Sequence, residues 1–156
     1  VYAYVPALIN YYLNEEPILA NIPTYLGSNP EHLAHILSHA HELVIKRVDQ
    51  SGGYGMLIGP AASEEQMEAY LKNVRYEAGR YIAQPVVGLS THPTYADDTK
   101  RFEPRHIDLR PFVLVGEDIT VVPGGLTRVA LRRGSLVVNS SQGGGSKDTW
   151  IVEERA

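Results

Sequence analysis

The sequence predicts an α+β domain, in which a mostly antiparallel sheet is combined with two to three helices. Apolar residues recur at three- and four-residue steps in three segments of the first half, the spacing of helices with one buried face. From His106 onward, short alternating runs are separated by turn residues, which is typical of antiparallel strands joined by hairpins. Together these patterns favour helices early in the chain and a strand meander at its end.

Composition restricts the function classes. The chain has 156 residues, 44% of them hydrophobic and 21% charged, and holds no apolar run near the ~20 residues that a membrane span needs. A formal net charge of −4 argues against a basic nucleic-acid-binding surface. The absence of cysteine excludes disulfides and thiolate catalysis, and favours a cytoplasmic location. We therefore expect no nucleic acid and no membrane among the partners.

The first segment predicts a helix that packs on something larger. Apolar residues at helical spacing run through residues 1–14, and Glu15–Pro23 contains two prolines and is expected to be extended. The chain opens without methionine, inside an apolar pattern, and nothing there resembles a signal peptide. We expect residues 1–22 to be a helix and connector from a larger parent fold, and residues 23–156 to form the main portion.

The second helix is predicted to begin at Asn29-Pro30, because Asn caps and Pro suits the first helical position. Its histidines include His35 and His39, which share one face and could form a metal pair. No Cys, Asp or Glu nearby completes a site at ligand spacing. Surface histidines are therefore the favoured interpretation.

A third helix lies within Ala61–Gly79, with a capping box at its start and Gly79 as the expected carboxyl-terminal cap. Tyr81–Val87 predicts a strand whose Pro85 makes it an edge strand or ends it. Ser90–Pro104, rich in Pro, Asp and Thr, predicts an exposed loop.

The end of the chain predicts a meander of three or four antiparallel strands. Its expected strands are His106–Val115, Ile119–Val122, Leu126–Leu131 and Leu136–Val138. Ser140–Lys147 follows, and its glycines predict no regular element, so that it is either flexible or ordered by a ligand.

The stretch Leu43–Pro60, L-V-I-K-R-V-D-Q-S-G-G-Y-G-M-L-I-G-P, is the strongest candidate site. Two short apolar strands flank a glycine-rich segment, and Lys46 interrupts the first strand. Glycines leave backbone N–H groups free to converge on an anion, which a strand-borne ammonium would also attract. The pattern predicts a phosphate-binding lysine and flap, although an ordinary hairpin with a glycine-rich turn would share it.

Further cations lie in the predicted meander. Asp108 and Arg110 share a strand face, and Arg128 sits in a neighbouring strand. Arginines facing a groove require a carboxylate or phosphate. An internal ion pair of Asp108 with either arginine would leave the other available for a ligand. Asn139 opens a second glycine-rich segment, and the two loops and three cations could surround one polyanion.

Several standard motifs are missing. The sequence contains no G-x-x-x-x-G-K-[ST] and no G-x-G-x-x-G. Triphosphate chemistry requires Mg²⁺ held by carboxylates, and Asp108 is the only good strand-borne candidate. The sequence itself assigns no metal ligand.

A series of motifs resembles one family. L-V-I-K-R-V-D-Q-S-G-G-Y-G-M-L-I-G-P, Y-I-A-Q-P, R-H-I-D-L-R-P-F-V-L, V-V-P-G-G-L-T-R-V-A-L and V-V-N-S-S-Q-G-G-G-S-K-D-T-W follow in the order found in circularly permuted ATP-grasp proteins. These bacterial proteins, long filed as domains of unknown function, are similar to the synthetase domain of glutathionylspermidine synthetase. The resemblance covers nearly the whole chain and indicates a carboxyl-terminal portion of that fold.

The resemblance implies a role for each matching residue. Lys46 would contact nucleotide phosphates beneath a loop formed by Ser51, Gly52, Gly53, Tyr54 and Gly55. The hinge would be formed by Gln84, Pro85, Val86 and Val87, with Gln84 taking the adenine amino group. Arg110 and Arg128 would act catalytically near the γ-phosphate or an acyl phosphate, with Asn139 opening the loop that faces them.

The implied function is the ATP-binding portion of a carboxylate–amine ligase that acts through an acyl phosphate. ATP, Mg²⁺, a carboxylate, an amine and the remainder of the parent chain would be its partners, and residues 23–156 its lid and central-sheet portion. The family's metal-binding acidic strand precedes these motifs, so this chain alone is expected not to turn over ATP. The alternatives are a nucleotide-binding regulatory module without chemistry and a structural fragment.

Overall fold

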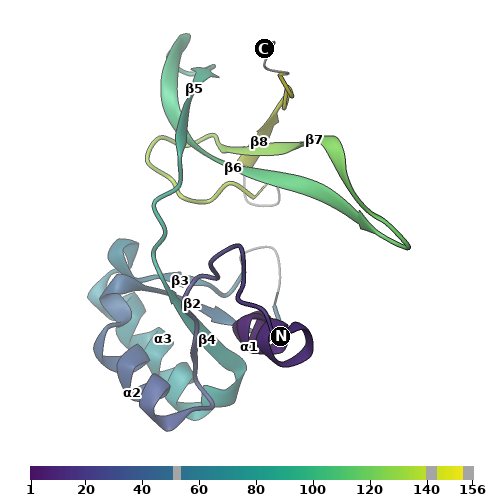
Figure 1. Ribbon diagram of the computed structural model, residues 1–156. Helices are drawn as coiled ribbons and strands as arrows, with labels where there is room; N and C mark the ends of the chain where they lie inside the picture. The colour runs from purple at the N-terminus through teal and green to yellow at the C-terminus, as the bar shows by residue number, and fades with distance from the viewer. Residues whose placement is uncertain (51–53, 140–143, 153–156) are drawn as a thin grey trace. The chain divides into compact units, whose positions relative to one another are not determined.

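A computed structural model describes residues 1–50, 54–139 and 144–152 of the chain. The chain folds into two compact units, Val1–Val87 and Gly88–Ala156 (Figure 1). Each unit contains one four-stranded antiparallel sheet, and all three described α-helices belong to the first. The predicted α+β class with mostly antiparallel strands is therefore confirmed. None of the described helices is long and apolar enough to cross a membrane.

The first unit alternates helices and short strands. Its α-helices are α1 (Val5–Leu13), α2 (Pro30–Ser38) and α3 (Glu64–Tyr76). Its strands are β1 (Tyr25–Leu26), β2 (Leu43–Arg47), β3 (Leu57–Ile58) and β4 (Tyr81–Pro85). Four 3₁₀ turns complete it: η1 (Tyr2–Tyr4), η2 (Ala40–Glu42), η3 (Gly59–Ala61) and η4 (Ala78–Arg80).

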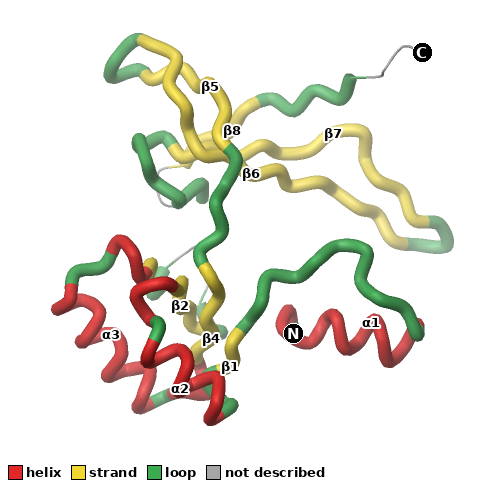
Figure 2. The backbone as a smooth tube through the Cα atoms, turned by 60° about the vertical axis from the view of Figure 1, so that its left-hand side comes forward, coloured by secondary structure: helices red, strands yellow, loops and turns green. Residues whose placement is uncertain are grey.

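The sheet of this unit has two different faces. Its strands run in the order β1-β4-β2-β3, and α2 and α3 lie on the same face (Figures 1 and 2). Alternate strand residues pack against these helices in one core, with Ile45 and Ala83 fully buried. The residues between them point to the other face, which α2 and α3 leave uncovered. We call this second surface the open face; it is formed by Leu26, Val44, Lys46, Ile58, Ile82 and Gln84.

The predicted helix starts are confirmed. The Asn29 side chain accepts hydrogen bonds from the backbone N–H groups of Glu31 (2.9 Å) and His32 (3.1 Å) at the start of α2. Ser63 and Gln66 form the capping box of α3. The prediction for Gly79 is wrong: α3 ends at Tyr76 with Glu77 as its carboxyl-terminal cap, and Gly79 lies inside η4.

Pro85 ends its strand, which is one of the two roles that the sequence predicted for it. β4 pairs with both β1 and β2, so it is a central strand. Pro85 is its last residue, opposite Leu43, and the chain leaves the sheet there. A proline is tolerated at this position because the ladder no longer needs its missing N–H.

The second unit corrects the predicted loop at Ser90–Pro104. Its strands are β5 (Thr91–Ala96), β6 (Arg101–Val115), β7 (Ile119–Ala130) and β8 (Gly144–Lys147), in that order. Pairing along β6 places Pro93 opposite Pro104, so a proline-rich polar segment became a hairpin. Cross-strand pairing overrode its composition because β-propensity depends strongly on context.

Three further predictions in this unit are wrong. Leu136–Val138 is not a strand, although Val138 is buried. Gly144–Lys147, predicted to hold no regular element, forms β8 by pairing with Thr127–Ala130. The two segments predicted between Ile119 and Leu131 are one strand, β7, which is long enough to pass through its Pro-Gly-Gly sequence.

The two faces of β2 give a stability test. Ile45 is fully buried, whereas its neighbour Val44 lies half-buried on the open face. We expect Ile45→Ala to lower the free energy of unfolding by about 2–5 kcal/mol, because it leaves a cavity between sheet and helices. Val44→Ala is the matched control and should cost clearly less in urea unfolding. Equal losses would contradict the assignment of the faces.

Candidate functional site

Lys46 and Gln84 lie together on the open face of the first unit. Lys46 pairs with Ile82 and Val44 pairs with Gln84, so Lys46 and Gln84 are diagonal neighbours on adjacent strands. Long side chains reach across such a diagonal. The Lys46 Nζ donates a hydrogen bond of 2.7 Å to the Gln84 Oε1. Two residues 38 positions apart, both predicted to contact nucleotide, are thus brought into direct contact.

Gln84 is also held from its other side. Its Nε2 donates to the Thr24 Oγ1 at 2.9 Å, and the Thr24 hydroxyl donates to the Ile22 carbonyl at 3.0 Å. Gln84 is only 7% exposed, so these contacts satisfy a buried amide. The arrangement is a continuous chain of donors from Lys46 to a backbone carbonyl.

Burial changes the proton affinity of Lys46. The side chain is half-buried, and loss of hydration lowers the pKa of its ammonium below the ordinary value. Among the described residues no carboxylate forms an ion pair with it. An ammonium that is partly dehydrated and is hydrogen-bonded to a neutral amide is suited to an anionic ligand.

A cavity of about 450 Å³ borders this lysine. It lies within the first unit, and Thr24, Lys46 and Ile82 line it together with the residues of η1. η1 is fixed there by Tyr2, whose hydroxyl accepts from the Ile22 N–H at 2.9 Å and whose carbonyl accepts from Asn21 at 3.2 Å. The cavity thus gives a ligand room beside the ammonium.

The residues directly before the glycine-rich segment, Arg47 and Asp49, belong to a network of ion pairs. Arg47 makes two parallel hydrogen bonds of 2.9 Å to Asp49, and further bonds to Glu77 (3.0 Å) and the Tyr81 hydroxyl (3.2 Å). The Arg47 hydrogen bonds lower the pKa of Asp49 to about 2, and the Asp49 bond is the first cause raising the pKa of Arg47. Arg80 adds a longer contact to Asp49.

The other end of the segment is held by Tyr70 of α3. Its hydroxyl donates to the Gly55 carbonyl at 2.5 Å and lies 3.2 Å from the Ile45 carbonyl. Burial, followed by the nearby Tyr81, raises the pKa of Tyr70 to about 12, so the phenol remains a donor at neutral pH. Gly55 has a φ of +63°, which glycine adopts without steric cost.

Three of the predicted loop residues, Ser51, Gly52 and Gly53, lie outside the described residues, so the structure places only the loop's two ends. Tyr54 is 62% exposed. Of the predicted hinge, Gln84 and Pro85 belong to β4, while Val86 and Val87 continue without regular structure to the end of the first unit.

In the second unit, Asp108 and Arg128 form the ion pair that the sequence left as one alternative. They are directly opposite each other on β6 and β7, and both oxygens of Asp108 accept from the guanidinium, the Nε at 2.8 Å. This pair raises the pKa of Arg128. Arg110 lies on the same face, exposed, and makes no ion pair with another described residue. Arg110 is therefore the arginine available for a ligand.

Asn139 is half-buried and follows a segment without regular structure, not the end of a strand as predicted. Its carbonyl accepts from the Gly144 N–H at 3.0 Å. The residues between them lie outside the described part of the chain. A role for Asn139 in a loop facing the arginines therefore remains a prediction.

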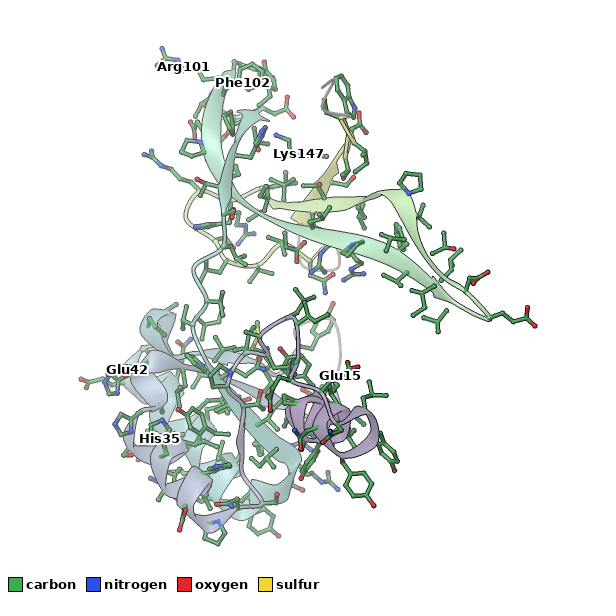
Figure 3. All side chains as sticks on the ribbon, in the orientation of Figure 1. Glu15, His35, Glu42, Arg101, Phe102 and Lys147 are labelled. Carbon is green, nitrogen blue, oxygen red and sulfur yellow. The ribbon has the colours of Figure 1, made fainter. Side chains whose placement is uncertain are left out.

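Sequence reasoning missed two cations of the second unit. Arg105 is 4% exposed and donates to Glu103 at 2.7 Å and to the Leu131 carbonyl at 3.1 Å. Lys147 of β8, labelled in Figure 3, donates to the Pro93 carbonyl at 2.6 Å and lies 3.0 Å from the His92 Nδ1. Both join segments distant in sequence, so a strand-borne cation alone could not have indicated their partners.

The histidines of α2 stack instead of converging. The rings of His35 and His39 lie 4.2 Å apart at an interplanar angle of 21°, and Tyr25 packs on His35. Within the part of the chain that the structure describes, no group of three His, Cys, Asp or Glu residues could hold a metal ion.

Comparison with known proteins identifies the family of this chain. The family model for circularly permuted ATP-grasp type 2 proteins matches residues 1–130. The chain belongs to the circularly permuted ATP-grasp type 2 family. Its two sheets and three helices fit a fragment of the ATP-grasp fold, and Lys46 and Gln84 lie within the matched region.

Longer bacterial proteins contain similar sequences. An uncharacterized protein of Synechocystis sp. is 56% identical over 98% of this chain, and one of Mycobacterium leprae is 51% identical over all of it. A Frankia alni protein named "Putative glutamate--cysteine ligase 2-3" is 51% identical over 97% of the chain. The chain spans 32%, 28% and 17% of these relatives' lengths, respectively. The family thus occurs within larger proteins.

The depressed pKa of Asp49 predicts a pH-dependent stability. Its folded pKa of about 2 lies below the ~3.9 of an unfolded chain, so its contribution is complete above pH ~4 and is lost as the pH falls towards 2. Asp49→Asn should therefore lower the urea midpoint at pH 7, and the deficit should shrink between pH 4 and 2. Asp97→Asn, at a carboxylate 91% exposed, is the control and should have little effect. A deficit that is independent of pH would contradict the ion-pair explanation.

The two arginines of the second unit should differ in stability effect. Arg128→Met leaves the partly exposed Asp108 carboxylate without its partner. It should lower the free energy of unfolding by about 1–2 kcal/mol, a value between those typical of exposed and of buried ion pairs. Arg110→Met should stay within about 0.5 kcal/mol. Urea unfolding of the two variants checks this, and a larger loss for Arg110→Met would reverse the assignment.

Proposed function

We propose that this chain is the ATP-binding portion of a carboxylate–amine ligase. The observation that carries the proposal is the partly dehydrated ammonium of Lys46, which is bound to a neutral amide beside a cavity and on a strand of an ATP-grasp protein. A phosphate chain would supply the negative charge that these neighbours lack. The name of the Frankia alni relative, a ligase, supports this class of reaction.

The proposed reaction joins a carboxylate to an amine in two steps. A carboxylate oxygen attacks the γ-phosphorus of ATP, releasing ADP and forming an acyl phosphate. The amine nitrogen then attacks the acyl carbon, losing a proton as phosphate leaves. Lys46 would hold phosphate oxygens. The catalytic role of Arg110, and of Arg128 once it is released from Asp108, would be to stabilise charge on the transferred phosphoryl group. Gln84 would accept from the adenine amino group with the free lone pair of its oxygen.

Mg²⁺ does not fit the described residues. They include no cluster of three possible metal ligands, and both oxygens of Asp108 already accept from Arg128. No step is therefore assigned to the metal on this chain. The same observation favours a second candidate, a module that binds nucleotide without catalysing a reaction.

Residues 1–22 are proposed to serve the longer protein. No residue of α1 is buried, and Tyr11, Tyr12 and Leu13 are 80%, 74% and 61% exposed. Since the relatives are three to six times as long as their match to this chain, the rest of such a protein would cover this apolar surface. This extends the proposal to a cytoplasmic ligase with the remainder of its chain as a partner.

Thermal unfolding with ATP–Mg²⁺ tests the proposal. Ligand at about one hundred times its dissociation constant should stabilise the chain by roughly 2.7 kcal/mol. Lys46→Met keeps the apolar stem of the side chain and should weaken ATP binding roughly tenfold or more, because a hydrogen bond to a charged group is lost. Lys72→Met, at an exposed lysine of α3, is the matched control and should bind as the unaltered chain does.

The outcomes separate the candidate functions. Stabilisation by ATP together with phosphate release from carboxylate and amine would support a ligase. Stabilisation without turnover, in this chain and in a full-length relative, would favour the binding module. No stabilisation at millimolar ATP in any form would leave a structural fragment.

A further inference from the structure

The hydrogen-bond chain on the open face has a fixed direction. Its first member, the Lys46 ammonium, can only donate, and its last member, the Ile22 carbonyl, can only accept. The Thr24 hydroxyl must therefore give its single proton to Ile22 and can only accept from Gln84. Gln84 in turn must present its amino group to Thr24 and its oxygen to Lys46. The two ends together determine which way the buried amide points.

Thr24 is placed to hold the amino end of this amide. Tyr25 pairs with Ala83, so the same register places Thr24 beside Gln84 on the open face. Thr24 is half-buried, while Gln84 is nearly fully buried, so water does not readily replace the hydroxyl. Without that acceptor, the Gln84 amino group loses its partner, and the amide is held from the Lys46 side alone.

We propose that Thr24 is a positioning residue for the nucleotide site: it orients Gln84 so that the amide oxygen holds the Lys46 ammonium on the open face. The inference rests on the proposed function for its consequence, the binding of ATP. The contact itself exists without nucleotide, so the two can fail separately.

The first experiment follows Lys46 without any ligand. NMR titration of the Lys46 side chain, assigned with the Lys46→Met variant, gives the pH at which its ammonium loses a proton. In Thr24→Val the amide is less firmly held and supports the charged form of Lys46 less well, so this midpoint should fall by about half to one pH unit. Thr24→Ser keeps the acceptor and should leave it unchanged. The other charged or titratable groups lining the same cavity are Tyr2, Tyr4, Arg47, Tyr81 and the amino group of Val1.

A double-mutant cycle tests the mechanism directly. In Gln84→Glu both side-chain oxygens are acceptors, so no orientation is needed to face Lys46. Thr24→Val should then leave the Lys46 midpoint unchanged, although it lowers the midpoint in the Gln84 background. Coupling of this kind isolates the contact between the two positions. Thr120→Val, on an exposed strand of the second unit, controls for the loss of a threonine hydroxyl.

ATP–Mg²⁺ binding, measured by calorimetry, gives the functional consequence. Thr24→Val should weaken binding by about five- to tenfold, and Thr24→Ser should restore it. An unchanged Lys46 midpoint in a folded Thr24→Val protein would overturn the proposal, and Thr24→Ala replaces that variant if it does not fold. A lowered midpoint in a protein that binds no ATP in any form would support the orientation of Gln84 and overturn the proposed function.

Discussion

Alternation along strand β2 places a core residue and a cation side by side in sequence and on opposite faces. Ile45 packs with α2 and α3, and Lys46 is consequently directed to the face that these helices leave open. A shift of register by one residue would bury the ammonium in the core, at a cost of several kcal/mol. The hydrophobic core therefore fixes not only the fold of the first unit but also the face to which the Lys46 ammonium is directed.

Partial burial distinguishes Lys46 from a fully hydrated surface lysine. A fully hydrated ammonium would gain little from a ligand, whereas Lys46 has already lost part of its hydration in the folded chain. Its hydrogen bond to Gln84 compensates for some of this loss with a neutral partner, so its positive charge remains uncancelled. Asp108 in the second unit differs from Lys46, because its charge is neutralised within the sheet by the Arg128 guanidinium.

The sequence predicted the elements whose signals are local. Capping residues at Asn29 and Ser63 and the strand run at Leu43–Val48 needed no knowledge of distant residues. The sequence did not predict the elements that depend on pairing with a distant strand. β5 is polar and contains proline, and β8 is half glycine. Each is nevertheless a strand, because it forms backbone hydrogen bonds with a neighbouring strand. Site residues divide in the same way. Lys46 could be predicted as a lysine interrupting an apolar strand, whereas Thr24 carries no signal of its own and gains significance only from its position opposite Gln84.

A glutamine at position 84 and a glutamate would affect the charge of Lys46 differently. A carboxylate beside Lys46 could accept the hydrogen bond of the ammonium with either oxygen. Its negative charge would, however, neutralise the positive charge that would attract a phosphate. A glutamine leaves the charge intact and requires a means of fixing its orientation, because its two ends differ in hydrogen-bonding character. Thr24 and the Ile22 carbonyl supply that orientation through two hydrogen bonds. The neutral amide of Gln84 and the Thr24 hydroxyl that orients it therefore act together. A substitution at either position should change the effect of a substitution at the other.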